Sequence, residues 1–134
     1  NSMKRHPRIG ETGELSFVVT EQHVIDFADE QMPAVLCTPW LIWFLEHAAR
    51  EAILPLLEPG ESTVGVHVDV EHLAPTPAGH EVVCTARVIN TDEQVISFQF
   101  DARDQHEQVA RGIHKMQVIR CDRFASRVQS KSTR

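Results

Sequence analysis

The spacing of apolar residues predicts one long, buried helix in the first half of the chain. From Trp40 to Leu57 apolar side chains recur at helical intervals, and early in this run they occupy nearly every side of the helix. A helix that is apolar nearly all round is enclosed by other structure. We expect it to begin at Thr38-Pro39, because threonine is a good N-cap and proline suits the first helical position, and to end at Pro59-Gly60.

After this helix the apolar period changes to that of a strand. Between Val64 and Val70 every second residue is valine, which is typical of a strand with one buried face. A short helix before the long one is expected to turn Val24, Ile25 and Phe27 inward. The other expected elements are a strand at 15–20, the short helix at 21–29, and strands at 81–90, 95–103 and 108–119. Short connections between the last strands indicate an antiparallel meander.

This order of elements predicts an α+β fold in a single domain. One antiparallel β-sheet wrapped around one long central helix buries an apolar face of both, and this arrangement is the hotdog fold. The chain has 134 residues, which favours one domain, 1–134, over two. Within it, residues 1–13 are expected to form a loose N-terminal arm and residues 121–134 a basic, flexible tail.

Charge and cysteine usage exclude several classes of partner. Residues 120–134 contain five basic residues and one acidic residue, whereas the rest of the chain contains eight basic and eighteen acidic residues. Such an acidic body cannot neutralise the phosphates of a nucleic acid. No apolar run approaches the roughly 20 residues that span a bilayer, so no membrane partner is expected. Cys37, Cys84 and Cys121 lie far apart without metal-ligand spacing, which predicts reduced thiols, no metal and a cytoplasmic location.

Three polar residues are candidates for chemistry. Counting by twos from Val64 places His72 on the sheet face that covers the helix, where it is either functional or a core histidine with a polar partner. Glu46 lies among apolar neighbours and can orient water or activate a nucleophile, although a surface pair with Arg50 also explains it. Thr38 lies where free N–H groups can stabilise a developing oxyanion, unless it is only the N-cap.

Several short motifs resemble one branch of the hotdog proteins. They are Thr38-Pro39-Trp40, Glu46, Ala48-Ala49, Val64-Gly65, the HLAPTP stretch from His72 to Pro77, and Gly79, with a weaker match at 101–104 and 112–114. Together they resemble the fluoroacetyl-CoA thioesterases. The resemblance implies hydrolysis of a short-chain acyl-CoA, without metal or cofactor, by the catalytic residues Thr38, Glu46 and His72. Selectivity for fluoroacetyl does not transfer with these motifs, because it depends on the acyl pocket.

The resemblance also implies a homodimer with shared sites. Thr38 and Glu46 are eight residues apart on the expected helix, so about 12 Å separates them along its axis, whereas a hydrogen bond spans about 3 Å. Related hotdog thioesterases place the helix start of one subunit opposite the helix carboxylate of the other. Thr38 either attacks the thioester itself or holds the attacking water.

Other residues and other functions remain as alternatives. Gly65 is expected to bind substrate by allowing close approach of its backbone, while His67 and Asp69 are expected to face solvent. His114 and Cys37 are expected to be structural, although a thiol at a helix start can become a nucleophile. A hotdog hydratase or dehydratase is the first rival function, but its histidine usually precedes the helix, where residues 24–37 contain none. A non-catalytic acyl-CoA-binding domain is the second rival.

Overall fold

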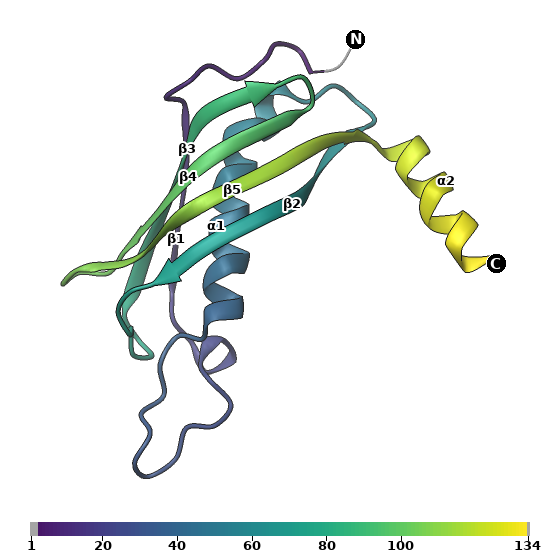
Figure 1. Cartoon of the computed structure of the whole chain (residues 1–134). Helices are drawn as coiled ribbons and strands as arrows, with labels where there is room; N and C mark the ends of the chain where they lie inside the picture. The colour runs from purple at the N-terminus through teal and green to yellow at the C-terminus, as the bar shows by residue number, and fades with distance from the viewer. Residues whose placement is uncertain (1–2, 134) are drawn as a thin grey trace.

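The computed structural model describes residues 3–133 as one five-stranded antiparallel sheet curled around one helix (Figure 1). Helix α1, Thr38–Ile53, is continuous and is followed by the 3-10 turn η2, Leu54–Leu56. The strands are β1 (Thr12–Val18), β2 (Glu61–His72), β3 (Glu81–Asp92), β4 (Val95–Arg103) and β5 (Gln108–Arg120). Their order across the sheet, β1-β3-β4-β5-β2, leaves β1 and β2 at the edges. The predicted α+β fold is confirmed.

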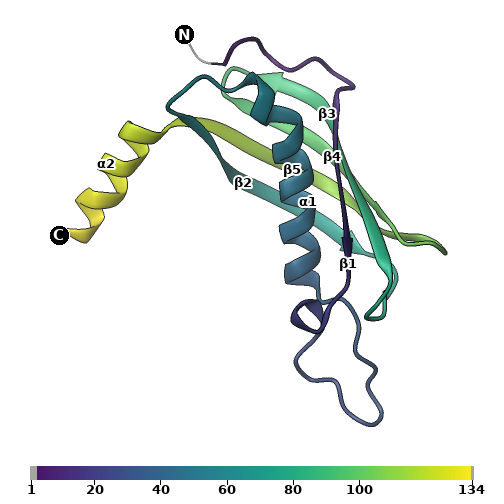
Figure 2. The same ribbon diagram turned by 180° about the vertical axis from the view of Figure 1, so that it is seen from behind.

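The core lies between α1 and the concave face of the sheet. From α1 it takes the buried residues Leu41, Phe44, Leu45, Ala48, Ala49 and Ile53. From the strands it takes, among others, Val82, Cys84, Ala86, Val88, Phe98, Phe100 and Ala102. Figure 2, seen from the helix side, shows that the sheet lies behind α1 and covers one side of it. The residues at positions 43, 46, 47 and 50 are exposed or half-buried, and their spacing places them on one uncovered stripe of the helix.

Strand β2 contains a β-bulge that the sequence did not reveal. Its register with β5 shifts between Gly65 and His67, which leaves Val66 as the extra residue. Gly65 before the bulge and His72 after it both pair with buried residues of β5, so both face the helix. The inward orientation of His72 agrees with the prediction. Val64, however, lies on the opposite face, because the bulge reverses the alternation between them.

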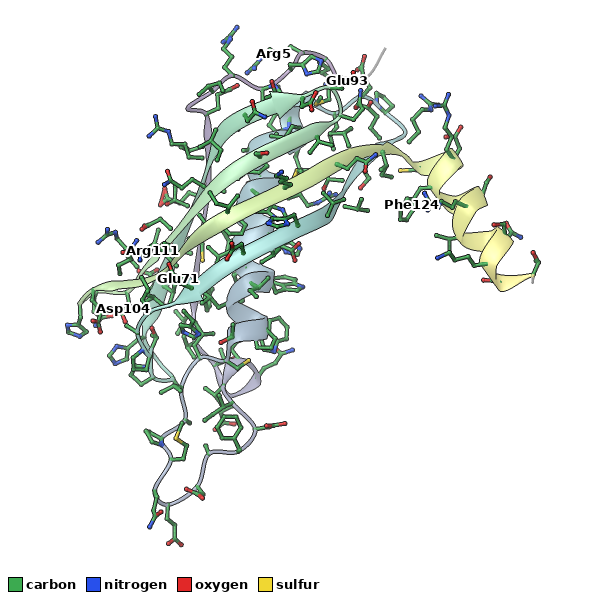
Figure 3. The ribbon with its side chains drawn as sticks, viewed as in Figure 1. Arg5, Glu71, Glu93, Asp104, Arg111 and Phe124 are labelled. Carbon is green, nitrogen blue, oxygen red and sulfur yellow. The ribbon has the colours of Figure 1, made fainter. Side chains whose placement is uncertain are left out.

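Residues 3–11 are attached to the body, which corrects the expectation of a loose arm. The backbone N–H of Met3 donates to a carboxylate oxygen of Glu61 at 3.0 Å, and the Met3 side chain is buried. Two hydrogen bonds of 2.8 Å join the guanidinium of Arg5, labelled in Figure 3, to the carboxylate of Glu11. The tertiary contacts of Met3 therefore position the chain before β1 begins. Residues 1–2 lie outside the described residues.

The segment between β1 and α1 is mostly a loop, which corrects the expectation of a helix at 21–29. Only Glu21–His23 form a helical turn, η1. The Ile25 N–H donates to the Val35 carbonyl at 2.9 Å, so that backbone hydrogen bonds run across the loop instead of along a helix. Phe27 is 64% exposed and does not point inward. Phe27 had been expected to lie with Val24 and Ile25 on the inner face of a short helix, but the backbone after His23 is not helical.

The C-terminal segment forms helix α2, Cys121–Ser132, where a flexible tail was expected (Figure 1). It projects from the end of β5 past the edge of the sheet, and none of its described residues is buried. Phe124, labelled in Figure 3, is 41% exposed. Its secondary structure therefore differs from the prediction, while its weak attachment to the body agrees with it. Within residues 3–133 no helix is long and apolar enough to cross a membrane.

Candidate active site

The first residue of α1 and the last residue of β2 meet in a hydrogen bond. Thr38 Oγ1 and His72 Nδ1 lie 2.8 Å apart, and we call these two residues the helix-start pair. The N-cap position is occupied by Cys37, which makes no side-chain capping bond, and Thr38 is the first residue inside the helix. The prediction that Thr38 is the N-cap is thereby corrected. The Thr38 hydroxyl is hydrogen-bonded to His72, and both residues line a hollow of about 310 Å³ together with Leu73.

Burial gives His72 the properties of a neutral base. Desolvation lowers the pKa of His72 below its ordinary value, and the nearby backbone at Ala74 opposes this effect in part. A neutral imidazole whose Nδ1 accepts the Thr38 hydroxyl proton carries its own proton on Nε2. Within residues 3–133 the Nε2 atom of His72 is buried without a hydrogen-bond partner. The pair therefore retains one buried polar atom that requires a partner.

Glu46 is not brought to the helix-start pair within one chain. Helix α1 runs unbroken from Thr38 to Ile53, which keeps these residues about 12 Å apart along the axis. The Glu46 carboxylate lies instead against Gly65 of β2, where a methyl group would overlap its Oε2 atom. The alternative of a surface ion pair with Arg50 is not found among the described residues. Arg50 donates to Thr63 Oγ1 at 2.7 Å.

A buried histidine completes the surroundings of Glu46. His114 is 1% exposed, and its Nδ1–H donates to the carbonyl oxygen of His67 at 2.9 Å. Its Cε1 atom lies 3.3 Å from the place that a Cβ on Gly65 would occupy. Desolvation lowers the pKa of His114, while the charge of Glu46 opposes this effect. Glu46, Gly65 and His114, together called the glutamate pocket, line a cavity of about 140 Å³.

Sequence reasoning found most of this arrangement but judged His114 to be structural. Its inward orientation was available from the strand alternation, yet its closeness to Glu46 depends on the register between β2 and β5, which no local pattern encodes. His67 and Asp69 are exposed, as predicted. Two larger hollows, of about 420 and 490 Å³, are lined by other residues, among them Arg123 and Arg111. Within residues 3–133 no group of three potential ligands could hold a metal ion.

One sheet around one helix, with polar groups at the helix start and on its uncovered side, defines the class of hotdog-fold thioester hydrolases. The profile of the fluoroacetyl-CoA-specific thioesterase family matches residues 19–122, and the chain therefore belongs to that family. It is an acyl-CoA thioesterase by this membership.

Individual relatives agree over nearly the whole length. The chain is 32% identical over 136 residues to the fluoroacetyl-CoA thioesterase of Streptantibioticus cattleyicolor, covering 97% of this chain and 98% of the relative. A solved structure of a fluoroacetyl-CoA thioesterase superposes with a TM-score of 0.88 at 29% identity, covering 95% of this chain and 98% of the other. A thioesterase superfamily member of Thermus thermophilus also gives a TM-score of 0.88, at 25% identity and 96% coverage of both chains.

Two strand glycines, Gly65 and Gly112, predict opposite effects of a methyl group. In Gly65→Ala the new methyl overlaps the end of the flexible Glu46 side chain and lies 3.3 Å from Cε1 of His114, so the carboxylate moves while the fold stays. We expect kcat to fall about 10- to 100-fold with little change in Tm. The control is Gly112→Ala, whose methyl meets the Asp69 carbonyl and the Val70 Cα, so that stability falls instead. Steady-state kinetics and thermal melts of both variants distinguish the effects, and an unimpaired Gly65→Ala enzyme would contradict the role of this contact.

Proposed function

We propose that this chain hydrolyses a short-chain acyl-CoA thioester to the free acid and CoA. The observation that carries the proposal is the hydrogen bond between Thr38 and His72 at the N-terminus of a buried helix. A helix N-terminus favours negative charge, and a carbonyl attacked by a nucleophile develops that charge on its oxygen. A neutral histidine beside a hydroxyl supplies the base that such an attack requires.

The site is proposed to be shared between two copies in a homodimer. Strand β2 is a sheet edge of 12 residues, and its Val66 and Val68 are 51% and 37% exposed. A long edge with exposed apolar side chains is a template for pairing with another chain. Two-fold pairing of β2 strands would also cover the uncovered stripe of α1, which includes Glu46. It would bring Glu46 of one copy toward the helix-start pair of the other, where His72 Nε2 has no partner among the described residues.

Within this shared site each residue has a distinct role. Glu46 and His72 transfer the protons of the reaction, and Thr38 with the helix N-terminus binds or attacks the thioester carbonyl. A Glu46 carboxylate that accepts the His72 Nε2–H would hold the imidazole with Nδ1 toward the Thr38 hydroxyl. Thr38 would then act as the nucleophile, His72 as the base and Glu46 as the carboxylate that orients the base. Gly65 is proposed to bind substrate by keeping this space open.

Short acyl groups are expected to be the best substrates. The glutamate pocket lines a small cavity, about 140 Å³, so a short acyl chain should fit there better than a long one. Release of CoA, followed with a thiol reagent over acyl-CoAs of increasing length, should give the highest kcat/KM for the shortest acyl chains. Hydration of an enoyl-CoA without CoA release would indicate a hydratase, and binding without turnover would indicate a sensor.

His72→Ala should lower kcat by roughly 10²- to 10⁴-fold, because it removes the base. Since burial lowers the pKa of His72, the neutral form persists to a pH below the ordinary value of 6.5. In the unmodified enzyme kcat should therefore decline with acidification only below that pH, as His72 becomes protonated. Kinetics across pH and a thermal melt of the variant test this. Near-normal turnover combined with a large loss of stability would identify His72 as a core histidine.

Complementation between inactive subunits tests the shared site. Thr38→Ala and Glu46→Ala should each be inactive alone. In a mixed dimer one composite site carries both substitutions and the other carries neither, so we expect about half of the wild-type activity per mixed dimer. Differently tagged subunits, exchanged and purified as heterodimers, give the measurement. Verified heterodimers that remain inactive would show that each site lies within a single chain.

A further inference from the structure

The orientation of His114 leaves one polar atom for the glutamate pocket. A carbonyl oxygen can only accept, so the hydrogen bond to the His67 carbonyl places the ring proton of His114 on Nδ1. The ring is stacked on Phe100 at a centroid distance of 5.1 Å and an interplanar angle of 15°. No second hydrogen bond to the ring is found within residues 3–133. The fully buried side-chain atoms that lack a hydrogen-bond partner do not include His114 Nε2, so this nitrogen keeps some accessible surface. Nε2 therefore borders the cavity with its lone pair.

A carboxylate and an imidazole lone pair are both acceptors, so they cannot bond to each other. They can be joined by a molecule with two donors, and water is such a molecule. The titratable groups that face His114 are Glu46 of α1 and His67 of β2. Burial keeps the ring neutral near physiological pH, so that Nε2 remains an acceptor there.

We propose that His114 is a positioning residue that, together with Glu46, holds the attacking water of the thioesterase reaction. This inference rests on the proposed function. A water that donates one proton to Glu46 and the other to His114 Nε2 directs its own lone pair away from both, toward the acyl carbon. The water oxygen then bonds to that carbon while one water proton passes to Glu46. The carbon–sulfur bond breaks, and the departing CoA sulfur takes that proton back from Glu46, which gives the free thiol and the acid and restores the carboxylate.

Burial of His114 has a cost that packing alone does not explain. An imidazole needs two polar partners, and the described residues supply only one, the His67 carbonyl. A phenylalanine would stack equally well on Phe100 without leaving Nε2 unsatisfied. Gly65 is a second observation that supports a bound water. Because it has no side chain, the space between the Glu46 carboxylate and the His114 ring stays open.

An acceptor series at this position tests the proposal. His114→Phe keeps the ring and its stacking but removes the acceptor, and we expect kcat to fall about 100-fold while KM stays within about two-fold. His114→Gln restores an acceptor oxygen and an N–H donor and should recover at least about a tenth of the wild-type kcat. Equal, near-wild-type turnover in both variants would overturn the proposal. If no acyl-CoA is hydrolysed by the unmodified enzyme, the proposed function itself fails, which is a different outcome.

Spectroscopy of the unmodified protein provides a readout that does not depend on how a variant folds. With ¹⁵N-labelled histidine, long-range ¹H–¹⁵N correlations report which ring nitrogen carries the proton, and the His114 signals are those absent from His114→Phe. We expect a neutral ring protonated at Nδ1 at pH 7. A proton on Nε2, or on both nitrogens, would overturn the proposal, because no lone pair would then face the water.

Discussion

Helix α1 must be buried on most of its surface, but one curled sheet can cover only one side of it. The rest of the structure follows from this mismatch. The uncovered stripe, which includes the exposed Trp43 and the half-buried Glu46, lies beside the free edge of the sheet. Polar groups at such a boundary are partly enclosed by the fold, yet they remain accessible to a small ligand. In the proposed homodimer, the association of two chains and the assembly of the reaction site would cover this same surface.

Strand β2 connects the two parts of the candidate site. Its middle, at Gly65, lies against Glu46, and its end, at His72, bonds to Thr38. The bulge at Val66 is what allows both positions to face the helix, since without it the two residues would lie on opposite faces. A single extra residue in one edge strand thus decides whether Gly65 and His72 both lie on the sheet face that packs against α1. Removal of that residue would turn His72 toward solvent without altering any local sequence motif.

The elements in which buried side chains recur at a regular interval, every second residue in a strand or every three to four in a helix, were predictable. Strand β4 has the predicted bounds, and α1 begins at Thr38, because both bury alternate or helical sets of side chains. Two other features depend on more than a burial period. The segment containing Phe27 has a helix-like apolar pattern but makes its backbone hydrogen bonds across a loop. His114 was correctly placed on an inner face, yet its relation to Glu46 links elements 68 positions apart in the chain, and only strand register brings them together.

Membership of the family determines the reaction, which is thioester hydrolysis, more firmly than it determines which acyl group is removed. Every acyl-CoA presents the same thioester, so the residues proposed to act on it, Thr38 and His72 with Glu46, can be shared by enzymes that differ in substrate. The surface that meets the acyl end is not fixed in this way. The cavity beside the glutamate pocket is lined by the apolar Met116 and by Arg50, which donates to the neutral hydroxyl of Thr63 and so keeps its positive charge. A lining that combines a thioether with a cation can distinguish acyl groups by polarity as well as by size, and size alone separates them by only about 1–3 kcal/mol per methylene.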